Sequence, residues 1–340
     1  MIYRAKAPLR ISFCGGGTDV SPYTEERGGV VLSATIDKYA YAALKPVAEP
    51  LARVTSLDFG ITREYPLGVH LESDGELDLV KGAINRFQEE AAFPCGLEIF
   101  LRTDAPPGSG LGSSSTMVTT LVGVLAEWLR RPLAPYEMAE LTYRIERVDL
   151  QIAGGRQDQY AAVFGGFNFM EFRADHTVVN PLRLRPGTIN ELEVSLLLCF
   201  TGQTRLGAHI VEKQARACAE GQSAVITSLD EMKRLTIEMK ALLLRDRLRE
   251  FGDRLHEAWE WKKQLQAEIS NQFIDRLYTR ARDEGAIGGK ILGAGGGGFL
   301  LVMAAFEKRH LVAKALEEEG GVIVPFAFEG NGLQAWTVTT

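Results

Sequence analysis

Two patterns of hydrophobic and polar positions run along the chain, and they predict different elements. Close alternation predicts strands at residues 5–14 and 97–103, with the sequences AKAPLRISFC and LEIFLRT. β-Branched and aromatic residues between 28 and 46 indicate one or two more strands. Apolar residues at steps of three and four predict a helix over 76–91. This part of the chain is therefore expected to mix strands and helices.

The next predicted elements follow a glycine-rich loop. One helix is expected to begin around Ser113 and a second at Pro135, since proline suits the first turn of a helix. The apolar face of the second helix reaches Val148, and this helix is expected to end near the glycine pair at 154–155. A strand is predicted at 167–172.

Proline and glycine interrupt two apolar segments at 183–191, RLRPGTINE, which predicts a domain boundary there. Residues 1–187 are expected to form one domain and residues 188–340 a second one, beginning with the predicted strand LEVSLLLCF. The remaining predicted helices cover 207–219, 223–244, 247–268, 271–284 and 307–319, and closing strands lie near 321–327 and 333–339. The pattern predicts an α+β fold with two domains.

Charge and composition narrow the possible partners. With 38 basic and 44 acidic residues the net charge is −6, and no run of Lys or Arg occurs, so neither nucleic acid nor an anionic membrane is an expected partner. The apolar runs are far shorter than the ~20 residues of a membrane helix, and the N-terminus lacks an apolar signal segment, so a cytoplasmic protein is expected. The four cysteines and five histidines show no metal-ligand spacing, and buried free thiols are expected.

The segment Pro106–Thr116, PPGSGLGSSST, is a candidate phosphate site. Its glycines and hydroxyl residues would expose backbone N–H groups, and a helix beginning inside it would point its positive end at the same place. A flexible Gly/Ser turn is the alternative interpretation. The Walker pattern fails because no GK[ST] follows.

A second glycine segment, Gly293–Gly298, formally matches the dinucleotide pattern GxGxxG. It precedes the strand-like sequence FLLVMAAF rather than opening a helix, which disfavours a dinucleotide site.

Arg10, Glu146 and Asp158 could each be an ordinary strand, helix or turn residue. Together they would supply what phosphoryl transfer requires, namely a cation beside the transferring group, a carboxylate for Mg²⁺ and an acid next to the attacking hydroxyl.

Three motifs in this order resemble those of the GHMP kinases, the family named for galactokinase, homoserine kinase, mevalonate kinase and phosphomevalonate kinase. They are Pro8–Asp19 (PLRISFCGGGTD), Pro106–Ser115 (PPGSGLGSSS) and Lys290–Gly298 (KILGAGGGG). The resemblance implies the two-domain fold of that family, with an N-terminal half like domain 2 of ribosomal protein S5, a C-terminal α+β half and the active site between them.

The resemblance also implies roles for matching residues. Asp158 would be the catalytic aspartate, with Arg10 facing it, and Mg²⁺ would bind the Ser114 hydroxyl and Glu146. The residues implied to bind ATP are Pro107, Gly108, Ser109, Gly110, Leu111, Gly112, Ser113, Ser114 and Ser115.

The turn Gly15–Asp19 carries the information on the substrate. Galactokinases read GEHTD where this chain reads GGGTD, so Asp19 would remain to accept sugar hydroxyls while glycines replace the Glu and His. Gly16, Gly17 and Thr18 are the other expected substrate contacts. The turn and its surroundings look most like those of bacterial D-glycero-D-manno-heptose 7-phosphate 1-kinases, and a similar turn occurs in kinases of L-fucose salvage.

A sugar phosphate substrate needs basic groups at its far end. Arg156, Arg205 and Lys213 are candidates, with Arg205 preferred because its loop contains glycine. The expected partners are thus ATP, Mg²⁺ and a sugar phosphate, for a monomer or homodimer. A kinase of L-fucose or another free sugar, and a sugar sensor without activity, remain as alternatives.

Overall fold

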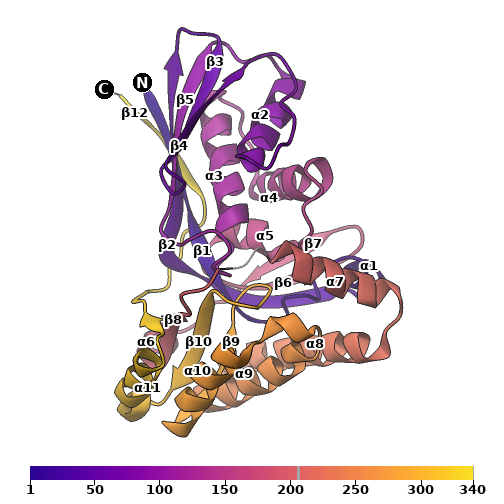
Figure 1. Ribbon diagram of the computed structural model, residues 1–340, viewed down its shortest axis with the longest axis vertical. Coiled ribbons are helices and arrows are strands. Elements are labelled where there is room, and N and C mark those ends of the chain that lie inside the picture. Colours follow the sequence, from indigo (N-terminus) through magenta and orange to yellow (C-terminus); the bar gives the residue numbers. More distant parts are fainter. Residues whose placement is uncertain (205–206, 340) are drawn as a thin grey trace.

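Two β-sheets organise the computed structural model, which describes residues 1–204 and 207–339 (Figure 1). The larger sheet has the strand order β12-β1-β2-β5-β3-β4, with β6 paired to β2 and β7 to β6; the smaller has the order β11-β8-β10-β9. The strands of the larger sheet are β1 Ile2–Cys14, β2 Gly29–Val47, β3 Leu51–Ser56, β4 Ile61–Pro66, β5 Gly96–Thr103, β6 Phe167–Phe172, β7 Thr177–Pro181 and β12 Gln334–Val338. Those of the smaller sheet are β8 Leu196–Phe200, β9 Ala286–Ile291, β10 Phe299–Ala304 and β11 Val322–Ile323.

Helices accompany both sheets. The helices before residue 187 are α1 Tyr23–Arg27, α2 Asp78–Glu90, α3 Ser113–Trp128, α4 Pro135–Arg144, the π-helical turn η1 Ile145–Asp149, and α5 Gln157–Phe164, with α6 Pro186–Ser195 crossing that point. The later helices are α7 Ala208–Ala219, α8 Ser223–Leu244, α9 Leu248–Lys263, the 3₁₀ turn η2 Ala267–Ile269, α10 Gln272–Asp283 and α11 Phe306–Glu318. Figure 1 shows α2, α3 and α4 on the same side of the larger sheet, with α8–α11 at the opposite end of the molecule.

The long strands β1 and β2 join the two ends of the molecule. β2 pairs with β6 through 29–34 and with β5 through 40–47. Side chains alternate along β1 because successive residues of a strand face opposite sides. Leu9, Ile11 and Phe13 therefore enter a core that also contains residues of β8, β10, α8 and α9. The two halves of the chain thus share a hydrophobic core, and Arg10 and Ser12 face the other way.

Most predicted elements are present. The strands at 5–14, 97–103 and 167–172 and the helices beginning near Ser113 and Pro135 appear with boundaries shifted by a few residues. The region 28–46 is one strand, β2. The free-thiol prediction is confirmed, because all four cysteines are free and Cys95 alone is not fully buried.

Three expectations differ from the structure. Residues 192–195 of the predicted strand LEVSLLLCF end helix α6, since Pro186 begins a helix there. β12 does not close the second half but pairs with β1 over residues 334–338. Val148 is 55% exposed, because the π turn at 145–149 changes the helical phase and buries Glu146 instead.

The domain boundary at 187/188 stays a prediction. Among the described residues, no helix is both long and apolar enough to cross a membrane.

Candidate active site

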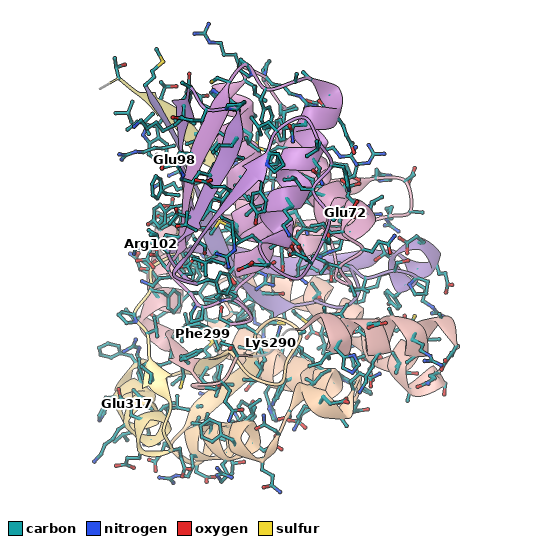
Figure 2. All side chains as sticks on the ribbon, turned by 45° about the horizontal axis from the view of Figure 1, so that its top comes forward. Glu72, Glu98, Arg102, Lys290, Phe299 and Glu317 are labelled. Carbon is teal, nitrogen blue, oxygen red and sulfur yellow. The ribbon has the colours of Figure 1, made fainter. Side chains whose placement is uncertain are left out.

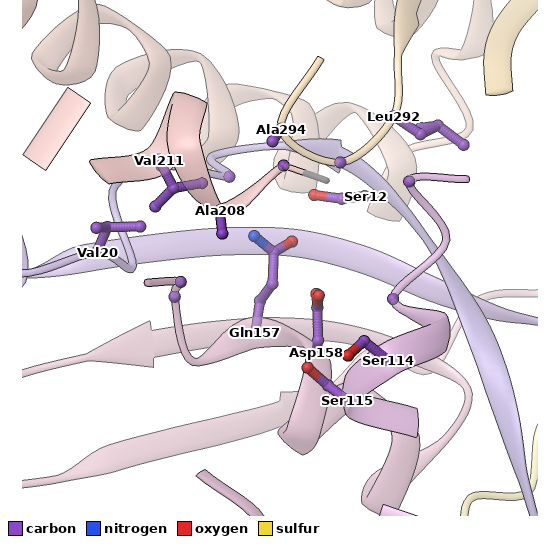
Figure 3. Close-up of a pocket in the computed structure, with 18 of the residues that line it drawn as sticks. Ser12, Val20, Ser114, Ser115, Gln157, Asp158, Ala208, Val211, Leu292 and Ala294 are labelled. Carbon is purple, nitrogen blue, oxygen red and sulfur yellow. The ribbon is translucent and has the colours of Figure 1, made fainter. Parts of the chain in front are cut away.

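A cavity of about 230 Å³ lies where the three glycine-rich segments meet (Figure 3). Its walls include Gly16 and Gly17, the phosphate loop at 108–115 and the glycine loop at 293–297. Gly207 and, from α7, Ala208, Val211 and Gln214 also line the cavity. The structure therefore brings Gly16 and Gly297, which are 281 positions apart in the sequence, to one cavity.

The phosphate loop connects β5 to α3 and leaves the N-terminus of that helix open. Gly108, Gly110 and Gly112 have φ values of 74°, 87° and 77°, which favour glycine over any other residue. Gly112 caps α3 without a side-chain hydrogen bond, so backbone N–H groups remain for an anion.

The expected ATP-binding residues divide into two groups. Those that line the cavity are Gly108, Gly110, Gly112, Ser113, Ser114 and Ser115. Ser109 and Leu111 are fully buried, and Pro107 is exposed outside the cavity.

The glycine loop supports the phosphate loop. A Cβ on Gly110 would lie 2.6 Å from the carbonyl oxygen of Leu292, and one on Gly298 would lie 2.1 Å from that of Ser109. The backbone N–H of Phe299 donates to the Ser109 carbonyl over 3.0 Å. The loop connects the antiparallel strands β9 and β10, unlike the strand-to-helix turn of a dinucleotide fingerprint.

Arg10 and Asp158 form a partly buried ion pair at the edge of the phosphate loop. The Arg10 Nε donates to Asp158 Oδ1 over 2.8 Å, and its Nη2 lies 2.6 Å from the same oxygen. Arg10 also donates from Nη1 to the Gly110 carbonyl and from its backbone N–H to that of Leu111. The Arg10 side chain is 4% exposed and that of Asp158 is 21% exposed. Asp158 thus keeps access to the cavity while Arg10 fixes its position.

Glu146 reaches the same cavity from the π turn. Its carboxylate accepts hydrogen bonds from the Ser115 hydroxyl at 3.0 Å and from the Gln159 amide. Burial raises the pKa of the Glu146 carboxyl above its usual range. Within the described part of the chain, the cation that pairs with it is Arg147, whose Nη1 lies 3.8 Å from Oε1 of Glu146. A buried carboxylate with so little compensating charge is a suitable ligand for a divalent cation.

The two candidate serines at this place differ. Ser115 donates to Glu146, whereas the exposed Ser114 hydroxyl lines the cavity (Figure 3). Hydroxyl and carboxylate oxygens are the ligands that Mg²⁺ prefers, so the residues present fit this ion.

Asp19 is enclosed by N–H donors. It accepts from the backbone N–H of Gly17 at 2.9 Å and of Gln157 at 3.0 Å, and from the Gln157 amide at 3.2 Å. Burial raises the pKa of the Asp19 carboxyl. A Cβ on Gly155 would lie 2.0 Å from its Oδ2, so glycine is needed there. The neighbouring Thr18 is buried and does not line the cavity; its hydroxyl bonds to the Gly15 carbonyl and to the backbone of Val30 on β2.

Sequence reasoning missed two lysines in the cavity wall. Lys290 donates to the Ser12 carbonyl over 2.7 Å, and Lys262 donates to the carbonyls of Ile291 and Gly293. Figure 2 places Lys290 in the middle of the molecule. Burial lowers the pKa of both ammonium groups, that of Lys290 to about 8. Lys262 lies in a stretch that reads as an amphipathic helix. Lys290 is the first residue of the third motif, but the motif assigns it no role, and its contact with Ser12 arises only in the folded chain.

Of the basic residues expected to bind the far phosphate of the substrate, two lie outside the cavity lining and one is not among the described residues. The Arg156 guanidinium lies 4.7 Å from the centre of the Tyr143 ring and 3.8 Å from Glu25, and it does not line the cavity. Lys213 forms an ion pair with Glu268. Arg205 lies outside the described residues.

Comparisons with known proteins agree with this geometry. The model of the GHMP kinases N terminal domain matches residues 78–166, and that of the GHMP kinases C terminal domain matches residues 239–321. The chain is 38% identical to the D-glycero-alpha-D-manno-heptose 7-phosphate kinase of Campylobacter jejuni over 98% of this chain and 99% of the relative. It is 29% identical to the bifunctional fucokinase/GDP-fucose pyrophosphorylase of Arabidopsis thaliana, over 93% of this chain and 31% of that protein.

A solved structure is similar throughout. The D-glycero-D-manno-heptose 1-phosphate kinase of Bacteroides thetaiotaomicron superposes with a TM-score of 0.85 at 36% identity, covering 99% of this chain and all of that one. The chain belongs to the GHMP kinase family. It is accordingly a phosphotransferase with the two-domain fold of that family, as the three motifs predicted.

Proposed function

We propose that this protein transfers the γ-phosphate of ATP to the anomeric hydroxyl of D-glycero-D-manno-heptose 7-phosphate, giving the 1,7-bisphosphate and ADP. The observation that carries this proposal is the Arg10–Asp158 ion pair, which lies between an open phosphate loop and the GGGTD turn. The name of the C. jejuni relative, similar over nearly its whole length, supports the choice of sugar.

The reaction needs a proton acceptor beside the attacking hydroxyl and positive charge beside the phosphoryl group. Asp158 faces the cavity and accepts the proton of the sugar O1 or orients that hydroxyl. Arg10 is held by the carbonyl of Gly110, so its charge is fixed between Asp158 and the phosphate loop. It holds Asp158 in place and stabilises negative charge on the phosphoryl group.

Glu146 and the hydroxyl of Ser114 would hold Mg²⁺, with Ser115 and Gln159 orienting the carboxylate. When bound, the ion neutralises charge on the nucleotide phosphates. We expect the enzyme to act in the cytoplasm.

A free-sugar kinase is the second candidate, favoured by the similarity to a plant enzyme named for fucokinase activity. A sugar sensor without activity is disfavoured because Arg10, Glu146 and Asp158 all line one cavity.

Release of ADP from ATP distinguishes these functions when heptose 7-phosphate, the unphosphorylated heptose and L-fucose are compared at equal concentration. The proposal expects the highest kcat/KM with heptose 7-phosphate. A higher value with L-fucose would overturn the choice of sugar, and no ADP release with any sugar would favour the sensor.

A further inference from the structure

One part of the cavity wall contains polar atoms without a partner. Among the described residues, the Ser12 hydroxyl and the Gln157 Oε1 are buried and make no hydrogen bond. Both residues line the cavity, and Figure 3 shows Gln157 pointing into it beside Asp158. A buried acceptor without a partner costs free energy, so a group that normally fills its place is expected.

The unpartnered atoms converge on one point. A Cβ on Gly16 would lie 3.1 Å from the Gln157 Nε2, 3.6 Å from its Oε1 and 3.5 Å from the Ser12 Oγ. The φ of Gly16 lies outside the left-handed region, so the backbone does not require glycine there. What glycine provides at this position is space, bordered by two hydrogen-bonding side chains.

Asp19 fixes the Gln157 side chain. Its carboxylate accepts from both the backbone N–H and the Nε2 of Gln157, which directs the amide oxygen away from Asp19. Asp19 is 1% exposed. The backbone of Ser12 is also fixed in position, because Lys290 donates a hydrogen bond to the Ser12 carbonyl.

We propose that Ser12 and Gln157, around the space left by Gly16, form a subsite that hydrogen-bonds hydroxyl groups of the sugar substrate. Gln157 offers an acceptor oxygen, and the Ser12 hydroxyl can donate or accept. Asp19 is the positioning residue that orients Gln157. This inference rests on the proposed function, and it explains what occupies the room that the glycines of the GGGTD turn leave.

Steady-state kinetics of Ser12→Ala and Gln157→Met test the subsite. Each variant is expected to raise the KM for heptose 7-phosphate about three- to tenfold, as the loss of one hydrogen bond predicts, with the KM for ATP unchanged. Gly16→Ala should do the same, because the added methyl group fills the space without straining the backbone. Ser33→Ala is the matched control: Ser33 pairs with Ser12 across β1 and β2, is buried with an unpartnered hydroxyl, and does not line the cavity.

Analogues of the substrate that lack one ring hydroxyl identify the interaction. For the wild-type enzyme, the KM for at least one analogue should be higher than the KM for the intact substrate. In Ser12→Ala or Gln157→Met, the KM values for that analogue and for the intact substrate should be equal. Asp19→Asn should add little to Gln157→Met, since both act on the same amide.

Two outcomes overturn the subsite. One is a wild-type sugar KM in both Ser12→Ala and Gln157→Met, and the other is an equal rise in the KM for ATP. If the wild-type enzyme turns over another sugar and not heptose 7-phosphate, the proposed function is wrong. The KM of Ser12→Ala and Gln157→Met for that other sugar, compared with the wild-type KM, then tests the subsite independently.

Discussion

Replacing Lys290 by Met is expected to change how the free energy of unfolding depends on pH. Burial lowers the pKa of Lys290 from 10.5 to about 8. Between these values the unfolded chain carries a proton that the folded protein lacks, so stability rises with pH through this window. The cost of the buried charge is fully present below pH 8.

The size of the effect follows from the two pKa values. The difference between 10.5 and about 8 corresponds to ~3 kcal/mol, of which ~2.5 kcal/mol falls between pH 7 and pH 10. Lys290→Met removes this contribution and also leaves the Ser12 carbonyl without its donor. That second loss does not depend on pH, so the slope reports the charge of Lys290 together with its coupling to Lys262 and Cys14.

Urea unfolding followed by tryptophan fluorescence at pH 7, 8, 9 and 10 measures the difference between the wild-type protein and the variant. Relative to the variant, the wild type should gain ~2.5 kcal/mol from pH 7 to pH 10. Lys45→Met, a change at an exposed position of β2, is the control for other groups that titrate in this range. Parallel curves for the wild type and Lys290→Met would refute the reasoning.

Three further substitutions test the site. Asp158→Asn should lower kcat by about 10²- to 10⁴-fold with ATP affinity unchanged, and full turnover would remove its catalytic role. Glu146→Gln should raise Tm at pH 7 without Mg²⁺, because burial raises the pKa of Glu146 and its charge therefore destabilises the fold above the usual carboxyl pKa. The rise in Tm that Mg²⁺ is expected to cause in the wild type should be lost in this variant. A rise in Tm with Mg²⁺ that persists in the variant would argue against Glu146 as a ligand of the ion. Gly110→Ala places a Cβ 2.6 Å from the Leu292 carbonyl at a φ of 87°, so thermal unfolding should show a lower Tm, unlike Gly187→Ala, which meets nothing within 4 Å.

The sequence predicted the strands and helices whose apolar positions repeat regularly, since burial of one face determines that repeat. It did not predict β3 and β4, where most side chains are partly or fully exposed and the pattern is weak. It also assigned β12 to the wrong partner. Pairing between strands more than 300 residues apart leaves no mark in the local pattern.

At the site, the resemblance assigned roles to the residues that match the family's motifs. Arg10 and Asp158 follow from motifs, and the structure brings them into contact. Ser12 lies inside the first motif and Gln157 lies next to Asp158, but the resemblance assigned no role to either of them or to Lys262. Their importance depends on the residues that face them across the fold. The contact of Asp19 with sugar hydroxyls stays a prediction. Asp19 lines the cavity, and the structure adds that its carboxylate accepts hydrogen bonds from the backbone N–H and side-chain amide of Gln157.

The π turn at 145–149 makes the site sensitive to chain length. Such a turn is an α-helical turn with one extra residue, and here it is closed by the hydrogen bond from Leu150 to the Ile145 carbonyl. Deleting one residue at 147–149 would let the helix continue regularly and would improve its internal hydrogen bonding. Because each residue of an α-helix advances by about 100°, the same deletion would put Glu146 out of phase with the segment that leads to Asp158. A shorter chain would thus gain a better helix and lose the contact between Glu146 and Gln159, the residue next to Asp158.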